Sequence, residues 1–263
     1  MSKVIILGAG AAPGVPSLAH GFGNCDAKNP KNIRLRSGTY MELSGVKFLI
    51  DTSPDLRMQL ILSDIRHIDA VFYTHTHADH LHGIDDLREI NRISGKAVEL
   101  FASKDNLAVI RSRFPYLIAD DATKIDPVYR AALHPNIFEY EQSFYFKDLK
   151  VTPIRLQGHN VECSGYIFND GEVVHISDFR EIPESALKLI KRKPELLIMP
   201  LTTPSGTRFH AGLEDLLDYA EKIDPTRVII NHMAVESDYA EVYSHCPSNM
   251  QPAYDGLTIE WAC

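Results

Sequence analysis

The chain has 263 residues, of which 44% are hydrophobic, and it carries a formal net charge of −8. That length can bury a large core in one domain, and the composition is ordinary for a globular protein. The acidic charge argues against a nucleic-acid partner, because phosphate contacts need clustered Lys and Arg. The sequence has no run typical of a signal peptide or a membrane span, and its four cysteines are widely spaced, so we expect a cytoplasmic protein with no membrane partner.

The first part of the chain predicts strands at 4–7, 39–43 and 46–50 and helices at 54–62 and 81–93. The early glycines do not match a dinucleotide-binding loop. Gly8, Gly10 and Gly14 lack the G-x-G-x-x-G spacing, and Pro13 stands where a helix should begin. We therefore expect these glycines to let the backbone turn tightly beside a binding site.

The most informative segment follows an apolar run at 68–73 that predicts a buried strand. It reads Thr-His-Thr-His-Ala-Asp-His and places four potential metal ligands within six residues: His75, His77, Asp79 and His80. Imidazole suits zinc, and carboxylate suits zinc and harder divalent ions. A polar loop that is His-rich by chance is the alternative, and the density of ligands argues against it.

Three more candidate ligands lie at or just past the ends of later apolar runs: His159, Asp178 and His232. A rigid site collects its ligands from the same end of several strands. One closed tetrahedral site needs four ligands, so seven suggest two metals that share a bridge. Asp51, at the end of another strand, is either an ordinary strand-end residue or a carboxylate that orients a ligand histidine.

The middle of the chain is less regular than its flanks. Residues 104–150 predict a helix at 106–114, contain Pro127 and Pro135, and end in an aromatic segment at 138–146. We expect an insertion that covers one edge of a single domain spanning 1–263. Helical patterns at 184–191 and 213–223 are each followed by a proline and a strand, which suits an α/β sandwich.

The pattern H-x-H-x-D-H, followed by a single His, a single Asp and a last His, resembles the metallo-β-lactamase superfamily. The resemblance implies an α/β fold of the αββα sandwich type. It also implies that one metal is held by His75, His77 and His159. The other is held by Asp79, His80 and His232, with Asp178 bridging. The flavo-diiron branch of the superfamily has a Glu at the position of His77. The histidine in this chain therefore favours hydrolysis over redox chemistry.

Within that superfamily the chain resembles the PhnP-like phosphodiesterases in three segments, at 7–16, 83–88 and 254–259. The resemblance implies that His210 reaches the substrate phosphate, and we take His210 and Asp79 as catalytic residues. A named member of the family holds a structural zinc with several N-terminal cysteines. This chain has only Cys25 in that loop, so we do not expect that zinc.

The resemblance implies a metal-dependent phosphoric diester hydrolase that uses a metal-bridging hydroxide on a small cyclic or nucleotide-like phosphodiester. Zinc is the default ion and manganese is compatible; a homodimer is left open. The first alternative is a ribonuclease Z-like tRNA 3′-processing enzyme, although no Gly-rich arm is present. The second is a non-catalytic carrier in cofactor biosynthesis.

The basic residues near the N-terminus form either an anion pocket or a solvated face: Lys28, Lys31, Arg34 and Arg36.

Overall fold

The computed structural model describes residues 1–118 and 133–262, and Pro127 therefore lies outside the described residues. Two sheets of seven strands each are formed by this part of the chain. The first has the order β14-β1-β2-β3-β4-β5-β6, with β1 Ser2–Gly8, β2 Gly38–Leu43, β3 Val46–Ile50, β4 Ala70–Phe72, β5 Val98–Ala102, β6 Leu133–Ile137 and β14 Leu257–Trp261. The second has the order β13-β12-β11-β10-β9-β8-β7, with β7 Phe144–Phe146, β8 Leu149–Leu156, β9 Cys163–Phe168, β10 Val173–His175, β11 Leu196–Pro200, β12 Val228–Asn231 and β13 Met250–Pro252.

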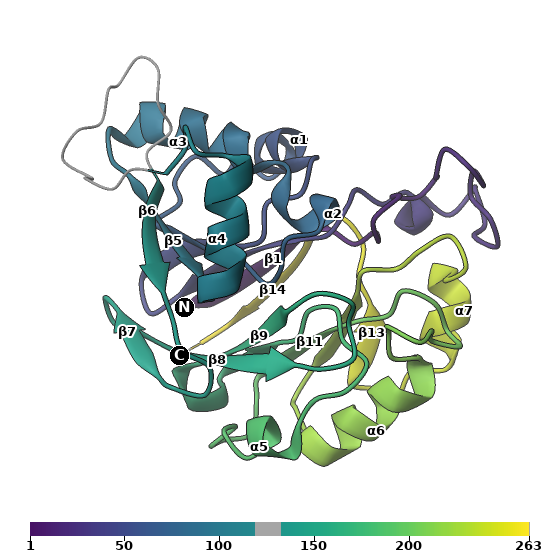
Figure 1. Cartoon of the computed structure of the whole chain (residues 1–263). Helices are drawn as coiled ribbons and strands as arrows, with labels where there is room; N and C mark the ends of the chain where they lie inside the picture. The colour runs from purple at the N-terminus through teal and green to yellow at the C-terminus, as the bar shows by residue number, and fades with distance from the viewer. Residues whose placement is uncertain (119–132, 263) are drawn as a thin grey trace.

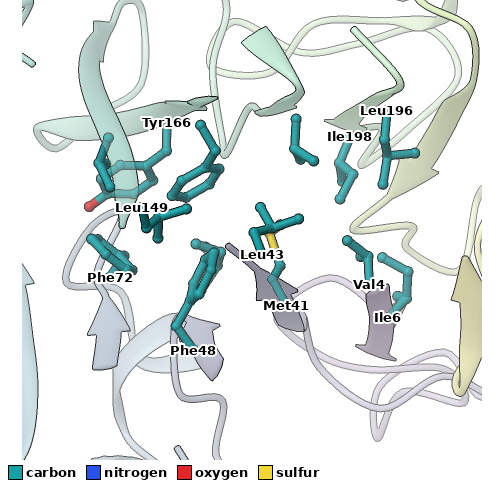
Figure 2. Close-up of a cluster of buried hydrophobic side chains, with 14 of the residues drawn as sticks. Val4, Ile6, Met41, Leu43, Phe48, Phe72, Leu149, Tyr166, Leu196 and Ile198 are labelled. Atoms are coloured by element: carbon teal, nitrogen blue, oxygen red, sulfur yellow. The ribbon is translucent and has the colours of Figure 1, made fainter. Parts of the chain in front are cut away.

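The core lies between the two sheets. Successive side chains of a strand point to opposite faces, so an apolar strand supplies two layers. In β1, Val4 and Ile6 join the cluster between the sheets, and Ile5 and Leu7 join the cluster on the outer face. Figure 2 shows side chains of both sheets, including Phe48 and Tyr166, pointing toward one another across this interface.

Helices cover the outer face of each sheet (Figure 1). The first sheet is covered by α1 Leu56–Leu62, α3 Leu87–Ser94 and α4 Lys104–Arg113, and the second by α5 Glu184–Leu187, α6 Leu213–Ile223 and α7 Tyr239–Ser244. The shorter elements are α2 Ala78–Leu81, η1 Pro30–Asn32, η2 Ile84–Asp86 and η3 Asn169–Gly171. The αββα sandwich expected from the sequence is confirmed. In the described ranges, no helix has the length and apolar character needed to cross a membrane.

Two predicted helices are shorter than the sequence pattern indicates. The helix expected at 81–93 is divided into α2, η2 and α3. Gly83 lies against the preceding loop, because its N–H donates to Thr52 O at 2.9 Å and a Cβ there would lie 1.9 Å from Ser53 O. The helix expected at 184–191 ends at Leu187, and the N–H of Lys191 donates to Asp170 O outside the helix. Tertiary contacts thus end both helices early.

The region expected to be an insertion contains regular structure in its described part. Strand β6 pairs with β5 at one edge of the first sheet, and β7 pairs with β8 at one edge of the second. The aromatic side chain of Phe144 stacks on Phe101, with ring centroids 5.3 Å apart. Strands β6 and β7 of this region are therefore the edge strands of the two sheets.

Candidate metal centre

The His-rich loop begins directly after β4 and is fixed by a buried carboxylate. Asp51 Oδ1 accepts from the N–H of Thr74 at 2.8 Å, and its Oδ2 accepts from Thr74 Oγ1 at 2.7 Å. Both residues are buried. These bonds hold the start of the loop against the end of β3. The four candidate ligands of the loop therefore lie close together at this edge of the sheet: His75, His77, Asp79 and His80.

The later candidate ligands reach the same point because of strand direction. Strands β10, β11 and β12 are parallel, and β8 runs the same way because β9 is antiparallel to both β8 and β10. His159, Asp178 and His232 each follow the carboxyl end of one of these strands. The sequence prediction that the ligands gather at one edge therefore matches this topology.

Three histidines converge in a first pocket. His75 Nε2 lies 3.1 Å from His77 Nδ1, and His159 Nε2 lies 3.2 Å from the same atom. A ring nitrogen has a single lone pair or a single proton, so these contacts cannot all be hydrogen bonds. Ligand atoms around a tetrahedral metal with bonds of ~2.0–2.1 Å lie ~3.3 Å apart, which is close to the spacing here.

A second pocket is formed by Asp79, His80 and His232. Three distances define it: His80 Nε2 to His232 Nε2, His80 Nε2 to Asp79 Oδ2, and His232 Nε2 to Asp79 Oδ2, each 3.3 Å. All three residues are buried. This triangle also has the edge length expected around a divalent ion.

Asp178 lies between the two pockets. Its Oδ2 is 3.9 Å from His75 Nε2 and 3.8 Å from His80 Nε2, and its Oδ1 is 3.6 Å from His232 Nε2. Asp178 Oδ1 is buried and has no hydrogen-bond partner. A buried carboxylate oxygen without a partner is costly. The atom faces the candidate ligands instead, and this His and Asp donor set would suit divalent metal ions, with Asp178 lying between the two groups of ligands.

The outer nitrogens of the ligand rings also have partners. Asp51 Oδ2 accepts from His80 Nδ1 at 2.7 Å, which directs His80 Nε2 into the second pocket. Thr202 Oγ1 lies 3.2 Å from His232 Nδ1, and Phe209 O lies 3.4 Å from His159 Nδ1. Such partners fix ring orientation at metal sites. Of the two alternatives for Asp51, the geometry supports the orienting carboxylate.

Without a cation, the two pockets differ in their protonation. Burial lowers the pKa of His75 and of His77, and lowers the pKa of His159 to about 4. Burial opposes the charged form of His80 as well, but Asp79 and Asp51 raise its pKa well above the usual value. Because a metal ligand must be deprotonated, loading the second pocket should release protons.

His210 faces both pockets but does not belong to either ligand triangle. Its Nε2 lies 3.5 Å from Asp178 Oδ2, and the side chain is 21% exposed. Thr207 Oγ1 accepts from the N–H groups of Phe209 and His210, so its own proton is available to His210 Nδ1 at 3.1 Å. That arrangement assigns the neutral ring a proton on Nε2, the atom that faces the site.

A cavity of about 730 Å³ opens over the pockets. It is lined by His77, Asp79, His159, Asp178, His210 and His232 on one side and by loop residues that include Leu18, His20, Arg36, Phe209 and Glu236. The sequence pattern gave no signal for Leu18, Phe209 or Thr202, since each is an isolated residue in a loop. His20 also lines this cavity, and it is exposed.

The basic residues near the N-terminus do not share one pocket. Arg34 is 2% exposed, and its guanidinium donates to Ala234 O at 3.3 Å and to Ser237 O at 2.8 Å. Lys31 Nζ lies over the ring of Tyr239, 4.4 Å from its centroid. The anion-pocket interpretation is therefore wrong for Arg34. Only Arg36, which is ion-paired with Asp55 at 2.6 Å, lines the cavity.

A family model described as a beta-lactamase superfamily domain matches residues 47–233, a span that contains all seven candidate ligands. The chain belongs to the metallo-β-lactamase superfamily. Its fold and ligand pattern are thus those of a superfamily composed mostly of metal-dependent hydrolases, and the resemblance inferred from the sequence is confirmed. The assignment of individual site residues stays a prediction.

Solved structures support a position near the PhnP group. A structure described as a new diphosphatase from the PhnP family has 28% identity and a TM-score of 0.86, and the match covers 100% of this chain and 98% of that one. The short form of human tRNase Z has 17% identity and a TM-score of 0.69, with 98% of each chain covered. The second likeness shows a shared fold only.

One curated relative is described by an activity other than phosphoric ester hydrolysis. A protein from Porphyromonas gingivalis described as an octanoyltransferase is 28% identical over 261 residues, which are 97% of this chain. This chain spans about half of that relative, 51% of its length. The name of the longer protein therefore does not define the activity of this domain.

Proposed function

We propose that this protein is a dinuclear metal-dependent hydrolase of small phosphodiesters or nucleotide-like phosphoric esters. The observation that carries the proposal is His210 Nε2, which lies 3.5 Å from Asp178 Oδ2 and lines the cavity over both pockets. A proton donor placed beside a doubly cationic site suits an ester whose phosphoryl oxygens and leaving oxygen gain negative charge.

When bound, two divalent ions lower the pKa of water from 15.7 towards ~7 and neutralise charge on the phosphoryl group. The protein's own part is positional. Asp178 Oδ2 lies 3.9 Å from His75 Nε2 of the first pocket and 3.8 Å from His80 Nε2 of the second, and Asp51 holds His80 through its Nδ1. The neutral ring of His210 donates a hydrogen bond from Nε2 to a phosphoryl oxygen, whereas the imidazolium form transfers the Nε2 proton to the leaving oxygen and returns to the neutral ring. Asp79, which we count as catalytic as well as a ligand, presents its Oδ2 to the second pocket, 3.3 Å from His232 Nε2.

The cavity volume favours a compact substrate. A volume of about 730 Å³ is within the ~300–1,000 Å³ range of small-molecule sites and suits a nucleotide-sized ester. The similar PhnP-family structure is described as a diphosphatase, so disubstituted diphosphates belong in the same substrate class to be tested. Zinc is the expected ion, with manganese as the alternative.

A substrate panel tests the proposal. Protein loaded with zinc or with manganese is assayed on a bis-aryl phosphate, cyclic nucleotides, a disubstituted diphosphate, pre-tRNA and nitrocefin. We expect turnover of at least one small phosphoric ester and little or none of nitrocefin. The Asp178→Ala variant reports contaminating activity. A preference for pre-tRNA over every small ester would favour the ribonuclease Z-like alternative, and a preference for nitrocefin would reject the proposal.

A further inference from the structure

A tight turn at residues 17–21 forms part of the wall of the cavity over the candidate metal pockets. Two backbone bonds close it, from Ser17 N to Gly21 O at 2.7 Å and from Gly21 N to Ser17 O at 2.9 Å. The N–H of His20 also donates to Ser17 Oγ at 3.1 Å. Gly21 has φ +55°, a conformation that favours glycine. The turn therefore has a defined shape and presents Leu18 and His20 at its tip.

The turn is also anchored to the segment that follows His232. Asn24 N donates to Val235 O at 2.9 Å, and a Cβ added at Gly23 would lie 2.7 Å from Val235 Cβ. Farther along the loop, Asp238 accepts from the side chain of Asn32 at 2.6 Å. In Figure 1 this N-terminal loop, drawn in purple, extends beside α7. Val235 and Asp238 follow the candidate ligand His232 closely in the chain. Their contacts therefore fix the position of the N-terminal loop relative to the second pocket.

The chemistry of this wall is apolar with one polar group. Leu18 is fully exposed, and Pro13, Ala19, Phe209 and Val235 line the same cavity. A single exposed leucine is common, but a continuous apolar wall beside polar groups is typical of a ligand site. His20 adds a hydrogen-bonding ring to it.

The charges of the wall exclude a second phosphate as its natural occupant. Among the described residues that line the cavity, Arg36 is the sole Arg or Lys side chain. Its Nε and Nη2 donate to the two oxygens of Asp55 at 2.9 and 2.6 Å, so much of its charge is already neutralised. Glu236 adds a negative charge to the same wall. An uncharged group fits this side better than an anion.

We propose that the 17–21 turn, with Phe209, is a subsite for a flat uncharged ring of the substrate, such as a nucleobase or an aryl group, and that Leu18 and His20 determine this preference. The inference rests on the proposed function, in which the phosphoryl group occupies the metal side of the cavity. The ring packs on Leu18, and His20 hydrogen-bonds its edge.

The test compares two esters that share charge and leaving group. Thymidine 5′-(4-nitrophenyl) phosphate carries a ring that the subsite can bind, and methyl 4-nitrophenyl phosphate does not. We expect Leu18→Ser to raise KM for the thymidine ester about tenfold, since burying a leucine side chain is worth ~1.5–3 kcal/mol and ~1.4 kcal/mol is tenfold. His20→Ala should raise the same KM, and both variants should lose selectivity for the thymidine ester over the methyl ester.

A matched control separates recognition from loop stability. Ile33 is another exposed apolar residue of the N-terminal loop, 54% exposed, and it does not line the cavity. Ile33→Ser should leave both esters unaffected. Equal changes for the two esters in Leu18→Ser, or the same effect in Ile33→Ser, would overturn the subsite.

Equilibrium binding distinguishes failure of the subsite from failure of the proposed function. Calorimetry with thymidine 5′-monophosphate and with methyl phosphate requires no turnover. Tighter binding of the nucleotide that is lost in Leu18→Ser supports the subsite even if neither ester is hydrolysed, in which case the proposed reaction alone is rejected. Equal affinities of the two ligands for the wild-type protein would overturn the subsite.

Discussion

The two candidate metal pockets share Asp178 but differ in how firmly the protein holds them. In the second pocket every residue is buried, and His80 is fixed by Asp51 through a 2.7 Å bond. Asp51 and His232 both have left-handed backbone, with φ of +63° and +57°. In the first pocket His77 is only partly buried, and the contact from His159 Nδ1 to Phe209 O is 3.4 Å long.

This difference suggests a division of roles. Non-glycine residues in left-handed backbone cost free energy and persist where the surrounding structure fixes them. The second pocket thus has ligands that are placed before an ion binds. Both pockets adjoin the cavity, but His77 of the first pocket is only partly buried, so this ligand has more freedom to adjust to substrate. We therefore expect the second pocket to bind its ion more tightly, and the following predictions test this comparison, from the largest effect to the smallest.

Asp178→Ala should weaken both pockets together. The substitution removes the oxygens that face His75, His80 and His232, so elemental analysis should find less than one metal per chain instead of about two. The activity should fall by ~10³-fold or more, since several kcal/mol of charge stabilisation are lost. Asp218→Ala, an exposed change on α6, is the control. Retention of two metals in Asp178→Ala would refute the bridging assignment.

His210→Ala should leave both pockets loaded and reduce the rate. Loss of one general acid costs ~10²–10⁴ in kcat, and the loss should be largest for a diester with a poor leaving group. An activated aryl ester needs little protonation, so the effect there should shrink. If His210 only binds phosphate, kcat should fall by the same factor for both substrates. His245→Ala on the exposed end of α7 is the control. Loss of metal, or unchanged rates on both substrates, would remove His210 from the chemistry.

Asp51→Asn should affect the second pocket more than the first, because Asp51 contacts His80 directly but reaches His75 only through Thr74. The amide presents N–H groups where His80 Nδ1 now donates, which disfavours the tautomer that directs Nε2 inward. Loss of such a partner typically weakens metal affinity ~10–100-fold. Competition with a chromophoric chelator should show two binding steps in the wild-type protein. We expect the tighter step to weaken more than the other step in the variant, and a change confined to the weaker step would reverse the comparison of the pockets.

His175→Leu should change the pH dependence of stability rather than metal binding. His175 is buried behind the second pocket, its Nδ1 has no hydrogen-bond partner, and burial lowers its pKa to about 3. An unfolded histidine titrates near ~6.5, so the unfolded chain binds a proton that the folded chain does not. Stability is therefore lost as the pH falls below ~6.5, by at most ~1.4 kcal/mol per pH unit from this residue.

Urea unfolding of the metal-free protein at pH values from 7 to 4 measures that contribution. The Leu variant should show a shallower decline in the free energy of unfolding than the wild-type protein. A parallel decline in both proteins would show that His175 does not contribute. Metal binding at neutral pH should be unchanged, because His175 belongs to neither ligand triangle.

Particular segments explain where sequence reasoning succeeded. Helix 213–223 was predicted with the bounds that α6 has, because its apolar residues repeat with helical spacing. In the structure, Asp215 caps its start by accepting from the N–H of Gly212. The expected helix 81–93 failed because Gly83 packs closely on a distant loop, a contact that no local pattern contains. Arg34 resembled an exposed cation in the sequence, but it serves backbone carbonyls of the 233–237 segment.

The sequence by itself determined the local features of this protein. The cluster from His75 to His80 needs only six consecutive residues after a strand, and alternation in β1 divides its side chains between two layers without knowledge of the partner sheet. Only the tertiary structure decided which distant groups meet. It places His80 Nε2 3.3 Å from His232 Nε2, 152 residues away, and it places Leu18 and Phe209 in one cavity. Such meetings depend on strand order and direction, which arise from burial of the whole core rather than from any single segment.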